Sequence, residues 1–223
     1  MSAAARAEAL VTETLARHPG RVALACSFGG PSGMALLDLG LRIDPTLPVY
    51  YIDTGLLFPE TYALVERTAR RYGIAPVALR TELSLEAQAE GFGERLWESD
   101  PDLCCSLRKV APHRAFLEGY DAWFTAIRRA QSSTRSDIEA VARDGERLLK
   151  VSPLFDWSDE DVWAYLNEHD VPVNPLLADG YPSLGCIPCT SRPAAGGDPR
   201  SGRWAGFGKT ECGLHLTHGR HAS

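Results

Sequence analysis

Residues 21–43, RVALACSFGGPSGMALLDLGLRI, contain a short apolar run, a turn rich in glycine and serine, and a second apolar run. The first run, 21–26, has the length and composition of a buried β-strand. The glycines that follow indicate a turn, and the second run is expected to form a helix. A strand, a turn and a helix in this order predict an α/β fold with a loop suited to ligands at the carboxyl end of the strand.

The same alternation continues along the chain. Further strands are expected at 47–52, 75–80, 121–127 and 148–154, and helices at 2–17, 61–73 and 157–170. This order predicts right-handed crossovers and a mostly parallel sheet flanked by helices. After Val171 the sequence becomes dense in proline and glycine. We therefore expect 1–170 to form the α/β nucleotide-binding part, and 171–223 to form a long loop and a flexible tail of the same structural domain.

Composition narrows the classes of function. The chain has 223 residues, of which 44% are hydrophobic and 23% charged, as in ordinary soluble proteins. No run of 18 apolar residues predicts a membrane span, and the first ten residues lack the apolar centre of a secretion signal, so we expect a cytoplasmic protein. The net charge of −6 argues against general nucleic-acid binding. Residues 186–223 nevertheless carry five Lys and Arg against two Asp and Glu, which suits a small anionic ligand.

Four of the six cysteines form two pairs, Cys104 with Cys105 and Cys186 with Cys189. Disulfides are not expected in a reducing compartment, and four thiolates are a full ligand set for one metal site. Neighbouring side chains on a helix diverge by about 100°, so they converge poorly on one ion but can each hold a separate iron atom. The spacing therefore favours a 4Fe–4S cluster over the alternatives, which are zinc and unligated or disulfide-bonded cysteines.

A fifth cysteine stands alone near the end of the chain. Cys212 lies in GKTECGLH, with Lys209 three residues before it and His215 three residues after it. A free thiol has a pKa of about 8.5, and nearby positive charge favours the reactive thiolate. Cys212 is thus a candidate nucleophile, and an incidental surface thiol is the alternative. Cys26, at the end of an apolar run, is explained by burial alone.

The turn after the first strand is a candidate phosphate-binding loop. Backbone N–H groups at the start of a helix can hold a phosphate, and glycines permit its close approach. The stretch SFGGPSG matches neither a Walker A loop nor a dinucleotide fingerprint, and a plain strand-to-helix turn is the alternative.

Seven stretches together resemble the assimilatory sulfonucleotide reductases, which act on adenylyl sulfate (APS) or phosphoadenylyl sulfate (PAPS). They are SFGG (27–30), YIDTGLLFPETY (51–62), CCSLRK (104–109), IRRAQSSTRS (127–136), GCIPC (185–189), GRW (202–204) and ECGLH (211–215). The resemblance runs from about residue 22 to 215 and implies the adenine nucleotide α-hydrolase fold. The paired cysteines resemble the cluster-bearing branch of the family, which generally uses APS. The chain departs from common family patterns at Ala130, where an acidic residue is frequent, and at Pro31 and Ser32.

The resemblance also implies roles for individual residues. Cys212 would attack the sulfur of APS, form an S-sulfocysteine and release AMP, and external thioredoxin or glutaredoxin would then release sulfite. Residues 171–223 would be the cluster-binding loop and catalytic tail, and the cluster would be structural and electrostatic. Substrate-binding residues are expected at Ser27, Phe28, Gly29, Gly30, Asp53, Thr54, Gly55, Lys109, Arg128, Arg129, Arg200, Arg203 and His215.

Three other functions fit parts of the sequence. A PAPS reductase lies nearest, but the additional cysteines favour APS. An ATP-pyrophosphatase-type ligase or RNA-thiolation enzyme usually carries S-G-G-x-D-S, whereas here no aspartate follows the loop until Asp38. A zinc-stabilised nucleotide-binding module is the remoter reading. The expected partners are the small molecule APS and the protein reductant, with neither nucleic acid nor membrane, and a homo-oligomer is compatible with the sequence.

Overall fold

A computed structural model describes residues 1–194, 196 and 198–215 of the chain. Six strands form one sheet in the order β3-β2-β1-β4-β6-β5. The strands are β1 (Val22–Ala25), β2 (Val49–Ile52), β3 (Val77–Leu79), β4 (Ala122–Phe124), β5 (Val141–Asp144) and β6 (Leu148–Val151). All neighbours are parallel except β5 and β6. The predicted mostly parallel sheet is confirmed, and β5 is an additional antiparallel edge strand.

Eight α-helices lie in the described part of the chain: α1 (Ala3–Arg17), α2 (Pro31–Ile43), α3 (Pro59–Tyr72), α4 (Leu85–Phe92), α5 (Leu96–Ser99), α6 (Pro101–Cys105), α7 (Ala111–Leu117) and α8 (Asp159–Glu168). A π-helical turn, η1 (Ser106–Val110), joins α6 to α7, and 3-10 turns lie at η2 (Arg129–Gln131), η3 (Ser133–Arg135), η4 (Pro175–Leu177) and η5 (Ile187–Cys189). Local sequence explains where several helices begin and end. Ser158 caps the start of α8 with a capping box, and Gly73 ends α3 in the left-handed conformation. None of these helices is long and apolar enough to cross a membrane.

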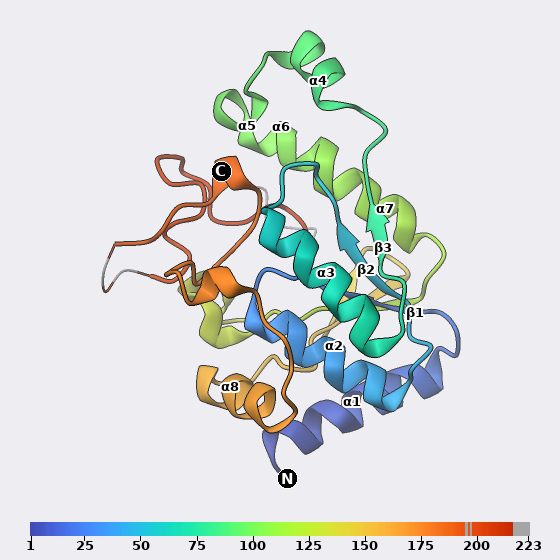
Figure 1. The fold of residues 1–223 in the computed structure, drawn as a ribbon. Helices are drawn as coiled ribbons and strands as arrows, with labels where there is room; N and C mark the ends of the chain where they lie inside the picture. The colour runs from blue at the N-terminus through green and yellow to red at the C-terminus, as the bar shows by residue number, and fades with distance from the viewer. Residues whose placement is uncertain (195, 197, 216–223) are drawn as a thin grey trace.

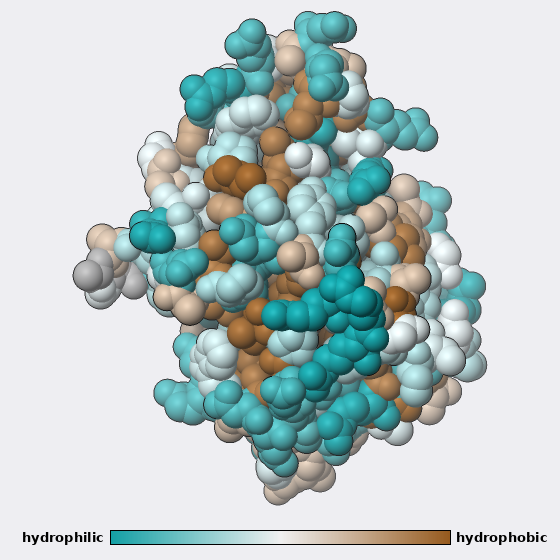
Figure 2. Space-filling model, in the orientation of Figure 1, coloured by the Kyte–Doolittle hydropathy of each residue, from teal (hydrophilic) through white to brown (hydrophobic). Residues whose placement is uncertain are grey.

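Helices cover both faces of the sheet (Figure 1). Successive side chains along each strand point to opposite faces of the sheet, because the backbone is pleated. Leu24 and Phe124 pack in the larger core, which includes residues of α1, α2 and α8, whereas Ala23 and Trp123 face the smaller core beneath α7. On the face drawn in Figure 2, hydrophilic side chains cover most of the surface, and hydrophobic atoms appear mainly in the recesses between them.

The strand order creates a crevice between β1 and β4. From β1 the chain proceeds to β2 and β3 on one side, and then returns to β4 on the other side of β1. Loops that leave the carboxyl ends of β1 and β4 therefore diverge, which is where open α/β sheets bind ligands. An isolated bridge from Leu57 to Cys186 attaches the later chain to this end of the sheet, and a second bridge, Thr190 to Arg203, joins two parts of the later chain itself.

Candidate functional site

A cavity of about 460 Å³ opens at the carboxyl ends of β1, β2 and β4. Its size is in the range typical of small-molecule sites. Its walls come from the loop after β1, the end of β2, the loop after β4, and the tail segment that ends at His215. Elements far apart in the sequence thus meet at the crevice that the strand order predicts.

The loop after β1 forms one wall. Phe28 has a left-handed backbone (φ 52°) and is fully buried, with its ring edge-to-face against Tyr51 at 5.7 Å. A Cβ at Gly29 would lie 3.0 Å from the Leu184 side chain, so glycine permits the later chain to pass over the loop. Helix α2 then begins at Pro31 without a side-chain cap at Gly30, which leaves its positive end beside the cavity. Ser27, Gly29 and Gly30 border the cavity, whereas the Phe28 side chain supports the loop from below.

In the loop after β2, Asp53 stabilises the backbone turn, whereas Thr54 borders the cavity. Asp53 is buried and accepts hydrogen bonds from Tyr62 Oη (2.6 Å), Arg80 Nε (2.8 Å) and Gly55 N (3.0 Å). Burial alone would raise the pKa of Asp53, but these bonds outweigh burial and lower it. Asp53 therefore fixes the turn at Gly55 (φ 73°) and is not part of the cavity wall, whereas Thr54 borders the cavity.

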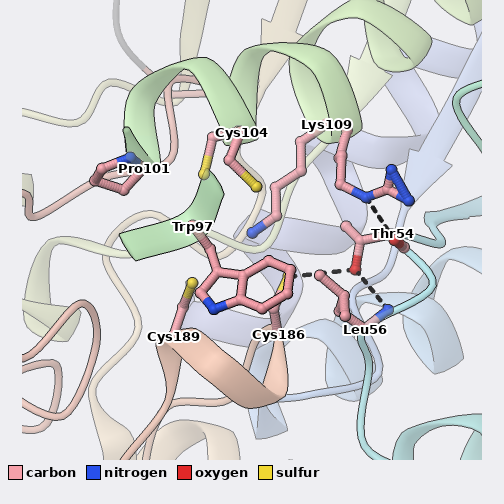
Figure 3. A pocket seen from close by; sticks show the side chains of 10 residues that line it. Thr54, Leu56, Trp97, Pro101, Cys104, Lys109, Cys186 and Cys189 are labelled. Carbon is pink, nitrogen blue, oxygen red and sulfur yellow. Dashed lines mark hydrogen bonds between the residues drawn. The ribbon is translucent and has the colours of Figure 1, made fainter. Parts of the chain in front are cut away.

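The four paired cysteines surround a second, small cavity next to the first (Figure 3). Cys104 and Cys105 end α6, Cys186 directly precedes the turn η5, and Cys189 is the last residue of that turn. The helix begins at Pro101, before the first cysteine, because Asp100 caps it. None of the four forms a disulfide, and no three of the described His, Cys, Asp and Glu residues are arranged to hold a single metal ion.

The chemistry of the small cavity fits a sulfur-ligated metal group larger than one ion. Burial, and then the other three thiols, raise the pKa of Cys104 to about 12, and burial raises the pKa of Cys189 to about 11. Cys186 differs: burial would raise its pKa, but Lys109 and a 3.2 Å contact with Thr54 Oγ1 lower it. Four thiolates can share so small a space only if positive charge lies between them. The donor set of four cysteines suits the predicted 4Fe–4S cluster.

Lys109 connects the two cavities. It lies on the π-helical turn η1 directly after the cysteine pair, is 9% exposed, and borders both cavities. Burial would lower the pKa of Lys109, but the thiols of Cys186, Cys212 and Cys105 raise it. Its ammonium also lies 5.8 Å from the ring centre of Trp204. A single buried cation thus faces the paired cysteines on one side and Cys212 on the other.

The predicted arginines do not all face the larger cavity. Arg200 and Arg203 border it, and burial lowers the pKa of Arg200 to about 10. Arg128 also borders it, but its guanidinium already donates to Ser32 Oγ (2.8 Å) and Trp157 O (2.8 Å) and pairs with Asp159.

Arg129 lies outside the cavity wall. It donates to Ile138 O at 2.8 Å and stacks on Phe155 at 4.9 Å. The two family departures have simple local roles: Pro31 begins α2, and Ser32 accepts the bond from Arg128.

Several cavity residues were not predicted from the sequence, and Arg135 is the most prominent. It lies in the stretch IRRAQSSTRS, is 8% exposed, and makes a buried ion pair with Glu211. Lys150 at the end of β6 borders the tail: its Nζ lies 3.4 Å from His215 O and 5.8 Å from the ring centre of Trp123. Lys150 lies near the carboxyl end of β6, which is a pattern that could have identified it, whereas Arg135 lies in the turn η3 of the long loop after β4 and carries no such signal.

The tail brings Cys212 into the larger cavity. Cys212 is partly buried and borders the cavity. Its thiol lies close enough to Lys109, Lys150 and Arg200 to act on the pKa of each, in the raising direction. His215, which is predicted to supply positive charge, lies in surroundings that disfavour its charged form. Burial, followed by Lys150 and Arg135, lowers the pKa of His215 well below its usual value, and its ring stacks on Trp123 at 6.0 Å.

Lys209 is paired elsewhere. It makes an ion pair with Asp102 on the cysteine-bearing helix, and its ammonium lies 5.6 Å from the Trp204 ring centre. The predicted tail segment 171–223 extends beyond the described residues, since 195, 197 and 216–223 lie outside them.

Comparisons with known proteins were made on the sequence and on the fold. A family model for the phosphoadenosine phosphosulfate reductase domain matches residues 21–192. An adenosine 5'-phosphosulfate reductase of Geobacillus thermodenitrificans is 46% identical over 198 residues, covering 88% of this chain and 84% of the relative. The structure of a phosphoadenylyl-sulfate reductase from Candida auris in complex with phosphate has a TM-score of 0.72 at 30% identity, over 83% of this chain and 90% of that chain.

A more distant structural likeness concerns the fold alone. The FMN adenylyltransferase of Candida glabrata matches with a TM-score of 0.59 at 20% identity, over 83% of this chain and 60% of that one. With the strand order above, this likeness confirms the predicted adenine nucleotide α-hydrolase type of fold.

Proposed function

Because the chain belongs to the phosphoadenosine phosphosulfate reductase domain family, we propose that it is an adenylyl-sulfate reductase that converts APS to sulfite and AMP in sulfate assimilation. The observation that carries the proposal is the position of Cys212. Its thiol borders the same cavity as the loop 27–30 and a set of buried cations. A nucleophile, an anion-binding surface and a loop suited to a nucleotide therefore meet in one site.

The reaction begins with attack by the Cys212 thiolate on the sulfur of APS. An S–S bond forms to that sulfur as the bond from sulfur to the bridging phosphate oxygen breaks, and AMP leaves with the electrons of that bond. This is nucleophilic catalysis with a covalent S-sulfocysteine intermediate. One thiol of a dithiol reductant then attacks Sγ of Cys212, the S–S bond to the sulfonate breaks, and sulfite leaves with the electron pair. The second thiol attacks the reductant sulfur of the resulting mixed disulfide and releases the Cys212 thiolate, so the dithiol becomes a disulfide and supplies both electrons.

Buried cations would hold the phosphosulfate and its leaving group. Lys109, Arg135, Arg200 and Arg203 border the cavity and are at most partly exposed. Fixed positive charge in a water-poor cavity stabilises charge that develops on the leaving phosphate. Ser27, Gly29 and Gly30, with the positive end of α2, would receive the phosphate and adenosine. His215, neutral and stacked on Trp123, would seat the tail in place of donating charge.

Cys104, Cys105, Cys186 and Cys189 would hold the 4Fe–4S cluster. When bound, it would tie α6 to the turn η5 and add an electrostatic centre beside Lys109. Residues 171–215 would then act as cluster-binding loop and catalytic tail of the single α/β domain that 1–170 begins. Since the C-x-x-C of Cys186 and Cys189 belongs to this ligand set, the dithiol is proposed to come from a separate thioredoxin or glutaredoxin.

A sulfite-release assay tests the substrate. Purified protein with thioredoxin is supplied with APS or with PAPS at equal concentrations, and kcat/KM is compared. A ratio that favours APS supports the proposal, whereas one that favours PAPS makes the chain a PAPS reductase. The ligase reading finds no support at the site, because Asp38 is buried between Tyr72 (2.8 Å) and Tyr165 (2.7 Å) and does not border the cavity.

A further inference from the structure

The indole N–H of Trp97 is a buried donor on a residue that lines the same cavity as the four cysteines. Trp97 lies on the short helix α5, immediately before the helix that carries Cys104 and Cys105. Its ring is partly exposed, but Nε1 is enclosed and has no hydrogen-bond partner among the described residues. Buried donors almost always have partners, so an unpartnered one in a functional cavity requires an explanation.

The cavity beside Trp97 brings four cysteine side chains near its ring. Trp97 and all four paired cysteines line the same small cavity. In Figure 3 its indole lies between the helix of Cys104 and the turn of Cys186 and Cys189. A neutral thiol is a weak acceptor, whereas a thiolate or sulfide with negative charge accepts a stronger, charge-assisted hydrogen bond. The N–H would therefore gain a good partner when the cysteines are deprotonated around an iron–sulfur group.

We propose that Trp97 donates an N–H···S hydrogen bond to the sulfur of the iron–sulfur cluster or of its cysteine ligands. The inference rests on the proposed cofactor and extends it to a residue outside the ligand set. Trp97 acts as a positioning residue: it stabilises negative charge on sulfur, slows loss of the cluster, and favours its reduced form. Hydrogen bonds to cluster sulfurs are among the factors that set reduction potential and affinity.

The test compares Trp97→Phe with wild type, both purified anaerobically. Phenylalanine keeps an aromatic ring but lacks the N–H. We expect iron release to a chelator to be several-fold faster and the midpoint potential to be more negative, because the reduced cluster loses a donor. Part of the shift of the Fe–S stretching bands between H₂O and D₂O, measured by resonance Raman, should also disappear.

Trp157→Phe is the matched control. Trp157 is also a buried indole whose Nε1 has no partner among the described residues, but it packs in the main core and does not line the cysteine cavity. It should keep wild-type iron release, potential and Raman shift. Thermal melting of the apo forms checks that both variants fold. If Trp97→Phe folds but does not contain iron, Trp97→Tyr, which restores a hydroxyl donor, must recover iron binding for the proposal to hold.

The outcomes separate this proposal from that of the cofactor. A wild-type protein with iron, and a Trp97→Phe variant with unchanged iron release and unchanged D₂O shift, would overturn the role of Trp97 and leave the cluster intact. A wild-type protein without iron would overturn both. Changes of equal size in the Trp157→Phe control would assign the effect to packing and contradict the hydrogen bond.

Discussion

Glu211 and Arg135 form a two-point ion pair: Arg135 Nε lies 2.7 Å from Oε1, and Nη2 lies 2.9 Å from Oε2. The two side chains are only 10% and 11% exposed, and Arg200 adds a third contact to Glu211 at 3.1 Å. Glu211 directly precedes Cys212, so the pair anchors the tail where the thiol enters the cavity. Buried pairs of this kind matter more than surface pairs because solvent screens them little.

The Glu211→Gln variant should slow formation of the Cys212 adduct. The change keeps the shape of the side chain but removes its charge, so the tail loses charge-assisted bonds worth about 1.5–3 kcal/mol, or roughly 10- to 150-fold in rate. Arg135 and Arg200 become free to bind substrate, so the affinity for APS should stay equal or increase. Single-turnover kinetics and equilibrium binding of APS measure the two effects separately.

Glu66→Gln is the control for Glu211→Gln. Glu66 pairs with Arg70 at 3.7 Å, but both side chains are more than 70% exposed, and such pairs contribute about 0–1 kcal/mol. This variant should match wild type in both measurements. A Glu211→Gln variant with wild-type adduct formation would show that the tail reaches the substrate without this anchor.

Cys212→Ser should abolish sulfite release while the fold and iron content persist. A serine hydroxyl is mostly protonated at neutral pH and is a far weaker nucleophile, and the proposed iron ligands lie elsewhere. Wild-type protein given APS without reductant should gain the mass of one sulfonate on the peptide that contains Cys212, and thioredoxin should remove it. Cys26→Ala should behave as wild type, since burial raises the pKa of Cys26 to about 12 and keeps it a thiol. An adduct on Cys26, or substantial turnover by Cys212→Ser, would disprove the mechanism.

Lys109→Ala and Arg203→Ala should each lower kcat/KM for APS by roughly 10- to 150-fold, as expected for loss of one charge-assisted contact. Arg129→Ala serves as the comparison. Arg129 was predicted with the substrate-binding set, but it bonds to Ile138 and stacks on Phe155 outside the cavity wall, so its loss should change kcat/KM less than threefold, about 0.6 kcal/mol. A larger effect of Arg129→Ala than of Lys109→Ala would reverse these assignments.

The mostly parallel sheet and the placing of the ligand-binding loops at its carboxyl edge could be predicted from the sequence. Short apolar runs alternate with helical ones, and the ligand-binding end of such a sheet is a general property of the fold. Strand β5 could not be found in this way. Only two of its four residues VARD are apolar and none is buried, and it is held at the sheet edge by pairing with β6.

The direction in which individual side chains point could not be predicted from the sequence. Arg128, Arg129 and Arg135 share one loop after β4, and each is a plausible ligand for an anion. Only packing decides that Arg135 turns toward Glu211 while Arg129 turns toward Phe155. Asp53 likewise follows a strand end, as a ligand-binding carboxylate would, but Tyr62 and Arg80 hold it in a structural network. Sequence patterns identify the loop, and tertiary contacts select the residue.

Metal analysis should find about four iron and four sulfide per chain in the anaerobically purified, brown protein. Cys186→Ser should lose most of the iron, because it removes a ligand. Cys26→Ala should retain it, since Cys26 lies in the main core. A colourless protein with one zinc per chain would contradict the cluster.

Lys150 should make the stability of the protein depend on pH above neutrality. Burial lowers the pKa of Lys150 to about 8 from 10.5, although Asp144, Glu211 and Cys212 oppose the effect and Arg135 adds to it. Between pH 8 and 10.5 the unfolded chain therefore binds more protons at this position than the folded one, so the Lys150 contribution to the unfolding free energy rises with pH. Below pH 8 the Lys150 side chain is protonated in both the folded and the unfolded state, and the folded protein carries the full cost of the buried charge.

Lys150→Met should thus be more stable than wild type at pH 7, by about 3 kcal/mol at most, and the difference should shrink as the pH approaches 10.5. Urea unfolding of both proteins at pH 7, 8, 9 and 10 measures this. A difference that stays constant from pH 7 to 10 would mean that the Lys150 ammonium is not buried at a cost.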